Sequence, residues 1–436
     1  MDYMDRNKTY VIKPSRLVGS VRVSGAKNSA LRLLAASILS GEKVELDNYP
    51  AKILDAQIQV EMLKCLGKDC NVQGNKIVIS ERNKLNNRLD WKGPSIRNTL
   101  LVLGALVART GQGAVPLPGG CLIGERRYDL HEMLLRAMGA DVWRENDMLL
   151  GQVKGKLKGT DIHLPIRSTG ATENAIICGA LAEGVTRVWN PHIRPEIIDL
   201  VAYLKKMGVD IKVYGQEHIK IKGSENLRSV HHNVIADNVE AITWLIGSMI
   251  TTGDVEIIDF PTQHLEVPLV FLRESGARFY AGEDRLIVRG GQCFPIDIST
   301  GPYPGINSDM QPLFAVYGLS ARGESRIIDL RFPGRYRYAE EMKKMGAAME
   351  TRGNMLIVNG TPHLKGARVV ATDLRAGISL VLAGLRAHGE TLIEDAWQIE
   401  RGYDHFEEKV RALGGEVKCG NQFRADSVPC SVAEHD

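Results

Sequence analysis

The strongest constraint on the fold is a sixfold internal repeat. Six segments share one pattern, an apolar run that ends at a glycine and continues into a short alternating stretch, and they begin at Ala30, Asn98, Thr172, Glu240, Met310 and Gly377. Steps of 70, 73, 69, 70 and 66 residues separate their marker glycines, which are Gly41, Gly111, Gly184, Gly253, Gly323 and Gly389. A period this regular indicates six similar supersecondary units.

Each unit contains two helices of different character. The first is apolar almost all round, as in LLVLGALVA from Leu100, and must be buried on every side. The second, as in LRAMG and MKKMG, ends at a glycine C-cap and leads into a pair of strands. We therefore predict an α/β fold with the unit helix, strand, helix, strand, strand. Six units divide into two lobes of three, with the helices inside, the sheets outside and the site in the cleft between the lobes.

The composition favours a folded cytoplasmic protein. The 436 residues are 44% hydrophobic and 25% charged, and the net charge of +3 gives no overall attraction to nucleic acid or to a membrane surface. The longest apolar runs, such as Ile242–Ile250, are shorter than the roughly 20 residues of a membrane span, and the first ten residues are polar. A reduced compartment fits the seven scattered cysteines, which are Cys65, Cys70, Cys121, Cys178, Cys293, Cys419 and Cys430.

A glycine- and proline-rich segment, Val115–His131, is predicted to be a flexible loop that carries Cys121. Arg126 and Arg127 follow closely, and cations of this kind lower the pKa of a thiol from about 8.5, which makes it a nucleophile or a proton donor. The alternative is an ordinary surface cysteine. Cys178, in an apolar helical run, is expected to be an inert buried side chain.

The entry to the first apolar helix is a candidate anion site. Lys27 and Asn28 follow Ser24 and Gly25, so that free backbone N–H groups and an ammonium group could hold an anion there. The spacing is not that of a nucleotide P-loop. A Ser or Asn helix cap beside a solvated lysine is an alternative explanation.

Other charged residues lie at the ends of the repeat helices. Asp309 precedes the fifth apolar helix, and taken alone it is predicted to be that helix's N-cap. Four more charged residues occupy corresponding positions just before or after repeat helices, and these are Arg97, Asp373, Arg375 and Arg401. The repeat geometry could bring several of these charges to one cleft. Taken singly, each is a solvated charge.

Together these residues resemble the enolpyruvyl transferase family, and within it the branch that acts on UDP-N-acetylglucosamine. The resemblance covers nearly the whole chain and rests on SGAKNSAL, LPGGCLIGER with the following DLH, STGATENA, PEIIDL, SDMQ, ATDLRA with LVLAGL, and ERGYDHFEEKVRALGG. It implies a pair of inside-out α/β barrels. The first lobe would span residues 27–235, the second 1–26 with 236–425, and 426–436 would be a tail.

The resemblance also implies the reaction. The enolpyruvyl group of phosphoenolpyruvate would pass to an acceptor hydroxyl through a tetrahedral intermediate, with release of phosphate. Cys121 would protonate the substrate or form an adduct with it, and Asp309 would take the proton of the acceptor hydroxyl. The phosphoenolpyruvate site would consist of Lys27, Arg97, Arg126, Arg375 and Arg401, with Lys27 also catalytic.

The acceptor implied by the resemblance is a uridine nucleotide. Its contacts would come from Asn28, Arg126, Asp129, Leu130, Ser168, Thr169, Gly170 and Asp309. No metal or organic cofactor is implied, and the partners are small molecules, without nucleic acid or membrane. The cysteine at position 121 implies sensitivity to fosfomycin and argues against the shikimate-pathway relative, which lacks that cysteine loop.

Departures from the family pattern cluster on the acceptor side. Arg127 and Tyr128 replace a Pro-Val pair before Asp129, Arg194 replaces the first acid of Glu-Pro-Glu, and Asn238 replaces the arginine of Asp-Arg-Ile-Glu. Additional positive charge there suggests a rival acceptor, uridine monophosphate, as in relatives from nucleoside antibiotic pathways. A third possibility is an inactive paralogue that binds a nucleotide and regulates.

Overall fold

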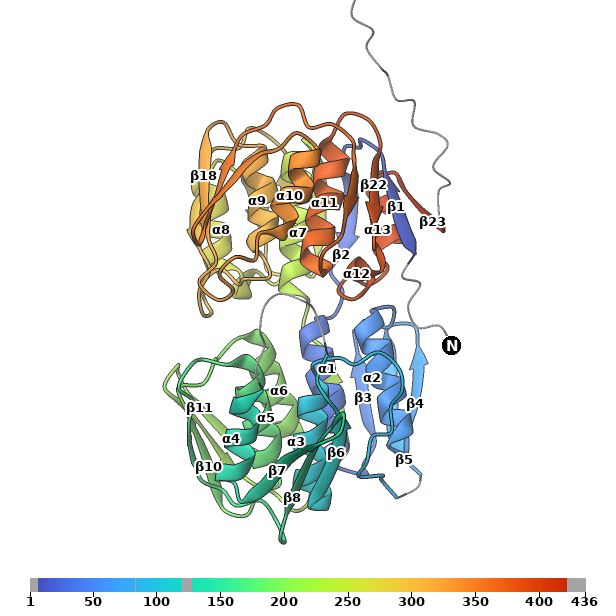
Figure 1. Cartoon of the computed structure of the whole chain (residues 1–436), viewed down its shortest axis with the longest axis vertical. Coiled ribbons are helices and arrows are strands. Elements are labelled where there is room, and N and C mark those ends of the chain that lie inside the picture. Colours follow the sequence, from blue (N-terminus) through green and yellow to red (C-terminus); the bar gives the residue numbers. More distant parts are fainter. Residues whose placement is uncertain (1–6, 83, 120–127, 422–436) are drawn as a thin grey trace, which may run out of the picture.

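The computed structural model describes residues 7–82, 84–119 and 128–421. Figure 1 shows two bodies stacked along the long axis, each with helices in the middle and strands around them. One hydrophobic core contains residues from Ala30 to Val234, and the other contains Tyr10 to Val23 together with Val239 to Val417. The predicted tail, from 426, lies outside the described residues.

The predicted unit recurs in both bodies, and the described elements carry its order of helix, strand, helix, strand, strand. In the first lobe the elements are α1 (Lys27–Ala36), β3 (Val44–Asp47), α2 (Leu54–Cys65), β4 (Lys68–Gln73), β5 (Lys76–Glu81), α3 (Thr99–Thr110), β6 (Gln112–Pro116), α4 (Asp129–Ala137), β7 (Ala140–Glu145), β8 (Met148–Val153), β9 (Asp161–His163), α5 (Thr169–Gly179), β10 (Val185–Trp189), α6 (Pro195–Lys206), β11 (Asp210–Tyr214), β12 (His218–Lys222) and β13 (Val230–Asn233).

The second lobe repeats this order and also takes two strands from the start of the chain. Its elements are β1 (Lys8–Ile12), β2 (Val18–Arg22), α7 (Asn238–Ile250), β14 (Asp254–Ile258), α8 (Glu266–Glu274), β15 (Arg278–Ala281), β16 (Arg285–Arg289), β17 (Asp297–Ser299), α9 (Gln311–Leu319), β18 (Glu324–Ile328), α10 (Arg337–Lys344), β19 (Ala348–Arg352), β20 (Met355–Asn359), β21 (Arg368–Val370), α11 (Leu374–Arg386), β22 (Thr391–Glu394), α12 (Trp397–Glu400), α13 (Phe406–Ala412) and β23 (Val417–Asn421).

Short parallel strands join neighbouring units, and the sequence analysis did not predict them. The strand β9 of the second unit pairs in parallel with β10 of the third, and β13 of the third unit returns to pair with β3 of the first. In the second lobe β2, β17 and β21 pair in the same way with β14, β18 and β22. Together with an isolated parallel bridge between Arg88 and Ala114, these pairings link the units of each lobe around its helices.

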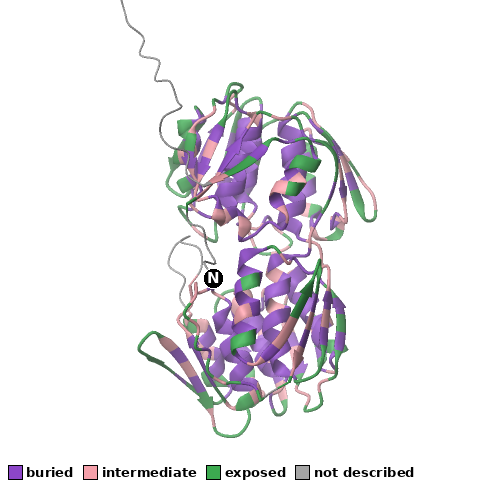
Figure 2. Ribbon diagram, turned by 90° about the vertical axis from the view of Figure 1, so that its right-hand side faces the viewer, coloured by how far each residue is buried: buried purple, intermediate pink, exposed green. Residues whose placement is uncertain are grey.

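The first helix of each unit lies inside its lobe, as predicted from its apolar sequence. All but the last two residues of α3 are buried, and all of α7 is buried. Figure 2 shows these helices in the buried interior, with exposed residues on the outer strands and loops. The helices α3 and α5 approach closely because Gly104 has no side chain, since a Cβ there would lie 1.9 Å from Oδ1 of Asn174.

Two extended segments cross between the lobes side by side. The amide of Ala26 donates to the carbonyl of Ile235 at 2.7 Å, and the amide of Asp237 donates to that of Ser24 at 2.9 Å. The side chain of Asp237 caps α7 through Oδ1 and accepts the amide of Lys27, at the start of α1, through Oδ2 at 3.2 Å. One carboxylate therefore fixes the first turn of a central helix in each lobe.

Replacing Gly25 by alanine in this crossing should destabilise the protein by about 1–3 kcal/mol, the usual range for overpacking. A Cβ at Gly25 would lie 1.8 Å from the backbone oxygen of Asn48, and neither backbone segment can move aside easily. Urea unfolding measures the loss. The control is Gly291→Ala, where nothing lies within 4 Å of the added carbon. Equal midpoints for the two variants would contradict the prediction.

Candidate active site

A buried triad of charges joins the two lobes. Nζ of Lys27, in α1, lies 2.6 Å from Oδ2 of Asp55, in α2. Arg401, from the second lobe, donates to both oxygens of Asp55 at 2.9 and 3.3 Å. Burial alone would raise the pKa of Asp55, but Lys27 and Arg401 hold that pKa below its usual range. Lys27 is buried, so the alternative of a solvated lysine beside a Ser or Asn cap is wrong; the N-cap is Ala26, without a side-chain bond.

A second charged cluster surrounds Asp309. Nη1 of Arg335 lies 3.0 Å from Oδ1 of Asp309, and Nε of Arg375 lies 3.5 Å from Oδ2. Burial opposes the charge on Asp309, yet Arg375 and Arg335 keep its pKa well below the ordinary value. The prediction that Asp309 is the N-cap of α9 is wrong. Met310 occupies that position without a side-chain bond, because the carboxylate of Asp309 points to the arginines.

Arg375 belongs to the Asp309 cluster and lies close to Gly402, the neighbour of Arg401. Its guanidinium lies over the ring of Tyr403 at 5.4 Å, and a Cβ on Gly402, next to Arg401, would lie 3.6 Å from Nη1. Arg375 is 1% exposed, its Nε faces Asp309 in the ion pair, and within the described parts of the chain its Nη1 has no hydrogen-bond partner. Because unpaired buried donors are costly, this arrangement fits an anionic ligand that would complete them.

The amino-terminal ends of α4 and α5 lie next to each other. The side-chain amide nitrogen of Asn174, in α5, is 3.1 Å from Nδ1 of His131, in α4. A Cβ added to Gly170 would lie 3.1 Å from Nε2 of the same histidine. Burial and the nearby charge of Arg97 lower the pKa of His131 to about 3, so this ring is neutral. These ends bring together most of the predicted acceptor residues, namely Asp129, Leu130, Ser168, Thr169 and Gly170.

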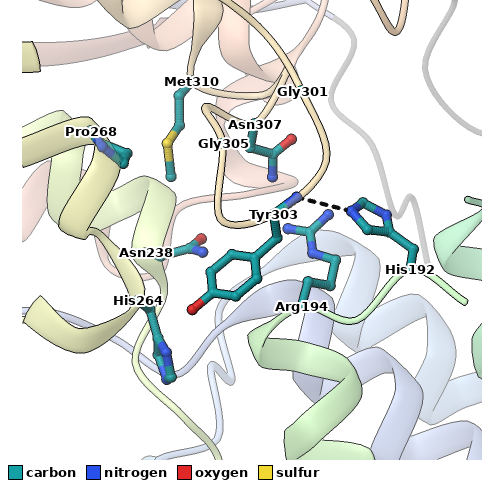
Figure 3. A pocket seen from close by; sticks show the side chains of 10 residues that line it. All are labelled: His192, Arg194, Asn238, His264, Pro268, Gly301, Tyr303, Gly305, Asn307 and Met310. Carbon is teal, nitrogen blue, oxygen red and sulfur yellow. Dashed lines mark hydrogen bonds between the residues drawn. The ribbon is translucent and has the colours of Figure 1, made fainter. Parts of the chain in front are cut away.

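A small cavity of about 30 Å³ lies between the lobes and includes Arg194. It is lined by His192, Arg194, Asn238, His264, Pro268, Gly301, Tyr303, Gly305, Asn307 and Met310, which Figure 3 shows converging from both lobes. Arg194 donates Nε and Nη2 to the two oxygens of Glu196 at 2.7 and 2.8 Å. Glu196 therefore offsets the charge of Arg194, and the effect of Arg194 on the choice of acceptor stays a prediction.

Some of the remaining predicted residues have a described position in the structure, and others lie outside the described part of the chain. Asn28 is half-buried in the first turn of α1, beside Lys27, and Tyr128 is half-buried just before α4. Arg97 lies just before α3 and near His131. Three predicted residues lie outside the described part of the chain, and these are Cys121, Arg126 and Arg127.

Sequence reasoning missed Asp55 and Arg335. Both are buried partners of predicted residues, and Arg335 also contacts Asp373, the N-cap of α11, at 3.4 Å. An Asp at the start of a second helix and an Arg after a glycine carry no local signal. Only long-range pairing reveals them.

The described residues lack two features that are typical of other classes of protein. They contain no group of three or more His, Cys, Asp or Glu side chains that could hold a metal ion. None of the described helices is long and apolar enough to cross a membrane.

A family model matches most of the chain. The model described as EPSP synthase (3-phosphoshikimate 1-carboxyvinyltransferase) matches residues 11–410. UDP-N-acetylglucosamine 1-carboxyvinyltransferase 1 of Carboxydothermus hydrogenoformans is 39% identical over 414 residues, which cover 94% of this chain and 98% of the relative. The UDP-N-acetylglucosamine 1-carboxyvinyltransferase of Shewanella sediminis is 38% identical over 409 residues, covering 92% of this chain and 97% of that one.

Solved structures show the same fold. The enolpyruvyl transferase NikO from Streptomyces tendae superposes with a TM-score of 0.85 at 24% identity, over 94% of this chain and 98% of NikO. EPSP synthase from Acinetobacter baumannii gives a TM-score of 0.75 at 19% identity, over 95% and 100% of the two chains.

Two lobes of inward helices and outward sheets, with buried cations where the lobes meet, define the fold class of the enolpyruvyl transferases. The chain belongs to the EPSP synthase family and is a 1-carboxyvinyltransferase. The resemblance and the predicted two-lobed α/β fold are confirmed.

Proposed function

We propose that this enzyme transfers the enolpyruvyl group of phosphoenolpyruvate to the 3-hydroxyl of UDP-N-acetylglucosamine, with release of phosphate, in the synthesis of a peptidoglycan precursor. The observation that carries the proposal is the convergence of buried cations, Lys27, Arg375 and Arg401, at the meeting of the lobes. Relatives at 37–39% identity over nearly the full chain have names that specify this acceptor.

Phosphoenolpyruvate carries a phosphate and a carboxylate, so its site requires several fixed donors. Nη1 of Arg375, which has no hydrogen-bond partner among the described residues, is one such donor group. Lys27 and Arg401 share one carboxylate, Asp55, so the triad keeps a net positive charge that would attract an incoming anion. In this proposal Arg97 supports the site. Arg126, which lies outside the described residues, is proposed to belong to it as well.

Asp309 is the proposed base. Its low pKa ensures that it is the carboxylate at neutral pH, which is the form able to accept a proton. The same low pKa makes Asp309 a weak base as long as no anion is bound beside Arg335 and Arg375. An anion bound to Arg375 would offset part of that positive charge and raise the proton affinity of Asp309. The base would therefore strengthen when phosphoenolpyruvate is in place.

The acceptor is proposed to bind at the paired ends of α4 and α5. Backbone N–H groups at the start of α5 and the hydroxyls of Ser168 and Thr169 suit a diphosphate, since helix N-termini favour anions. Asn28 and Asp309 would meet the sugar, and Asp129 and Leu130 the uridine. Cys121 is proposed to protonate the methylene carbon or to form an adduct, and that cysteine is the basis for expecting inhibition by fosfomycin.

Phosphate release from phosphoenolpyruvate, measured with UDP-N-acetylglucosamine in one reaction and uridine monophosphate in another, tests the proposal. We expect release with the sugar nucleotide and at least 100-fold less with the monophosphate, because a site built for a group rejects an analogue that leaves its polar contacts unpaired, by up to about 10⁴-fold.

The other outcomes each replace the proposed acceptor. Release with the monophosphate alone would assign the enzyme to nucleoside modification and make Tyr128 and Arg194 the first candidates for the difference. No release with either acceptor, while both nucleotides still bind, would support a regulatory paralogue. Cys121→Ser is the control for chemistry, since it should abolish release and keep nucleotide binding.

A further inference from the structure

One side chain of the cavity between the lobes bonds to both of them. Nδ1 of His192, in the first lobe, lies 2.8 Å from the hydroxyl of Thr169, at the start of α5. Its Nε2 accepts the backbone N–H of Tyr303, in the second lobe, at 3.3 Å, the dashed line of Figure 3. The amide of His192 donates to the hydroxyl of Thr172 at 3.0 Å, which fixes its backbone on α5.

The partners of His192 determine its hydrogen positions. A backbone N–H can only donate, so Nε2 must carry a lone pair. The ring is neutral, because burial and the nearby Arg194 lower its pKa to about 4, and the single ring hydrogen therefore lies on Nδ1. Nδ1 donates to the oxygen of Thr169, which leaves the hydroxyl hydrogen of Thr169 free to donate to an anion at the end of α5.

The loop that holds Tyr303 is rigid at its base and carries Asp309. The hydroxyls of Thr300 and Ser308, on its two legs, donate to the two oxygens of Asp329 at 3.0 and 2.6 Å. The amide of Gly301 also donates across the loop to Ile306 at 2.9 Å. Tyr303 and Asp309 therefore belong to one hydrogen-bonded loop, with Asp309 directly after its second leg.

We propose that His192 is a positioning residue that couples an acceptor phosphate at Thr169, in the first lobe, to the placement of Asp309 in the second. A phosphate oxygen that accepts the hydrogen of Thr169 would fix that hydroxyl, and with it the orientation of His192 and its bond to Tyr303. The inference rests on the proposed function, and it adds a link between acceptor binding and the base.

Two amide variants separate the two bonds of His192. In His192→Gln the amide oxygen can occupy the place of Nε2 and accept from Tyr303, whereas in His192→Asn the shorter amide reaches only Thr169. His192→Ala removes both bonds. We expect kcat to fall about 10- to 100-fold in the Ala and Asn variants, since small misplacements of a reacting group have effects of this size. The Gln variant should stay within about tenfold of wild type, and the KM for phosphoenolpyruvate should hardly change.

Hydrogen–deuterium exchange of peptides covering residues 300–309 tests the same link without turnover. Exchange at the Tyr303 amide should be faster in the Ala and Asn variants than in the wild type and the Gln variant. Addition of UDP-N-acetylglucosamine without phosphoenolpyruvate should slow exchange in this loop in wild type, and not in His192→Ala.

The inference is overturned if the loop exchanges equally in wild type and His192→Ala, or if the Gln variant loses as much kcat as the Ala variant. A uniform fall in thermal stability with unchanged kcat would also overturn it, since that is the result of a purely structural role. A wild-type protein that releases no phosphate with any acceptor refutes the proposed function instead, and the exchange experiment still decides whether His192 holds the loop.

Discussion

Asp309→Asn is expected to lower kcat by about 10²- to 10⁴-fold, the usual contribution of a positioned base. The amide keeps the shape of the side chain but cannot take the proton of the acceptor hydroxyl. Steady-state phosphate release measures the effect, and circular dichroism confirms the fold, because Arg335 and Arg375 lose part of their charge compensation.

Asp373→Asn is the matched control for Asp309→Asn. It removes a carboxylate from the same arginine, Arg335, at 3.4 Å, and asparagine remains a good N-cap for α11. We expect kcat within about tenfold of wild type, since only a partner of Arg335 is changed. If the two variants lost activity equally, the effect would come from the arginine cluster, and Asp309 would not be the base.

Asp55→Asn should destabilise the protein by about 3–5 kcal/mol at pH 7, because it removes the negative charge that Asp55 supplies to the buried Lys27 and Arg401. Inorganic phosphate or phosphoenolpyruvate should restore part of the loss by supplying the missing anion, and should raise the Tm of the variant more than that of wild type. Thermal unfolding measures both effects when it is done with and without phosphate at roughly 10 mM, a concentration that should saturate a weak anion site.

The pH dependence gives an independent check on Asp55. Because the folded-state pKa of Asp55 is depressed, its contribution is present above the ordinary Asp pKa of about 3.9 and is lost as the pH falls through the folded-state value. The difference in stability between wild type and Asp55→Asn should therefore shrink only below about pH 4. The control Asp47→Asn removes exposed pairs with Lys76 and His231 and should cost at most about 1 kcal/mol. Equal losses in the two variants would refute the special role of Asp55.

The repeat could be recognised from the sequence because each unit contains its own local signals. Apolar runs such as that of α3 show no polar face, and a left-handed glycine, Gly111 with φ 76°, ends that helix, so helix position and burial followed directly. The parallel strands β9, β17 and β21 were missed because each has three residues, too few to show an alternating pattern, and each pairs with a strand of the next unit.

The partners within the site could not be predicted in the same way. Locally, Asp309 before an apolar helix looks like a cap, and it is not one because Arg335, 26 residues further on, and Arg375 attract the carboxylate. Arg401 and Asp55 are 346 residues apart. Motif resemblance pointed to Lys27, Arg375 and Arg401, while their counter-charges depend on geometry that no local pattern contains.

The pairing of β1 and β2 with the second lobe has a consequence for biosynthesis. All of residues 27–235 leave the ribosome before β14, the partner of β2, and β1 must wait for β22 and β23 near the other end of the chain. At about 5–20 residues per second, β1 stays without its partners for roughly 20 to 80 seconds. The first lobe is free to fold during this time, and the sheet of β1, β22 and β23 in the second lobe can form only after that wait.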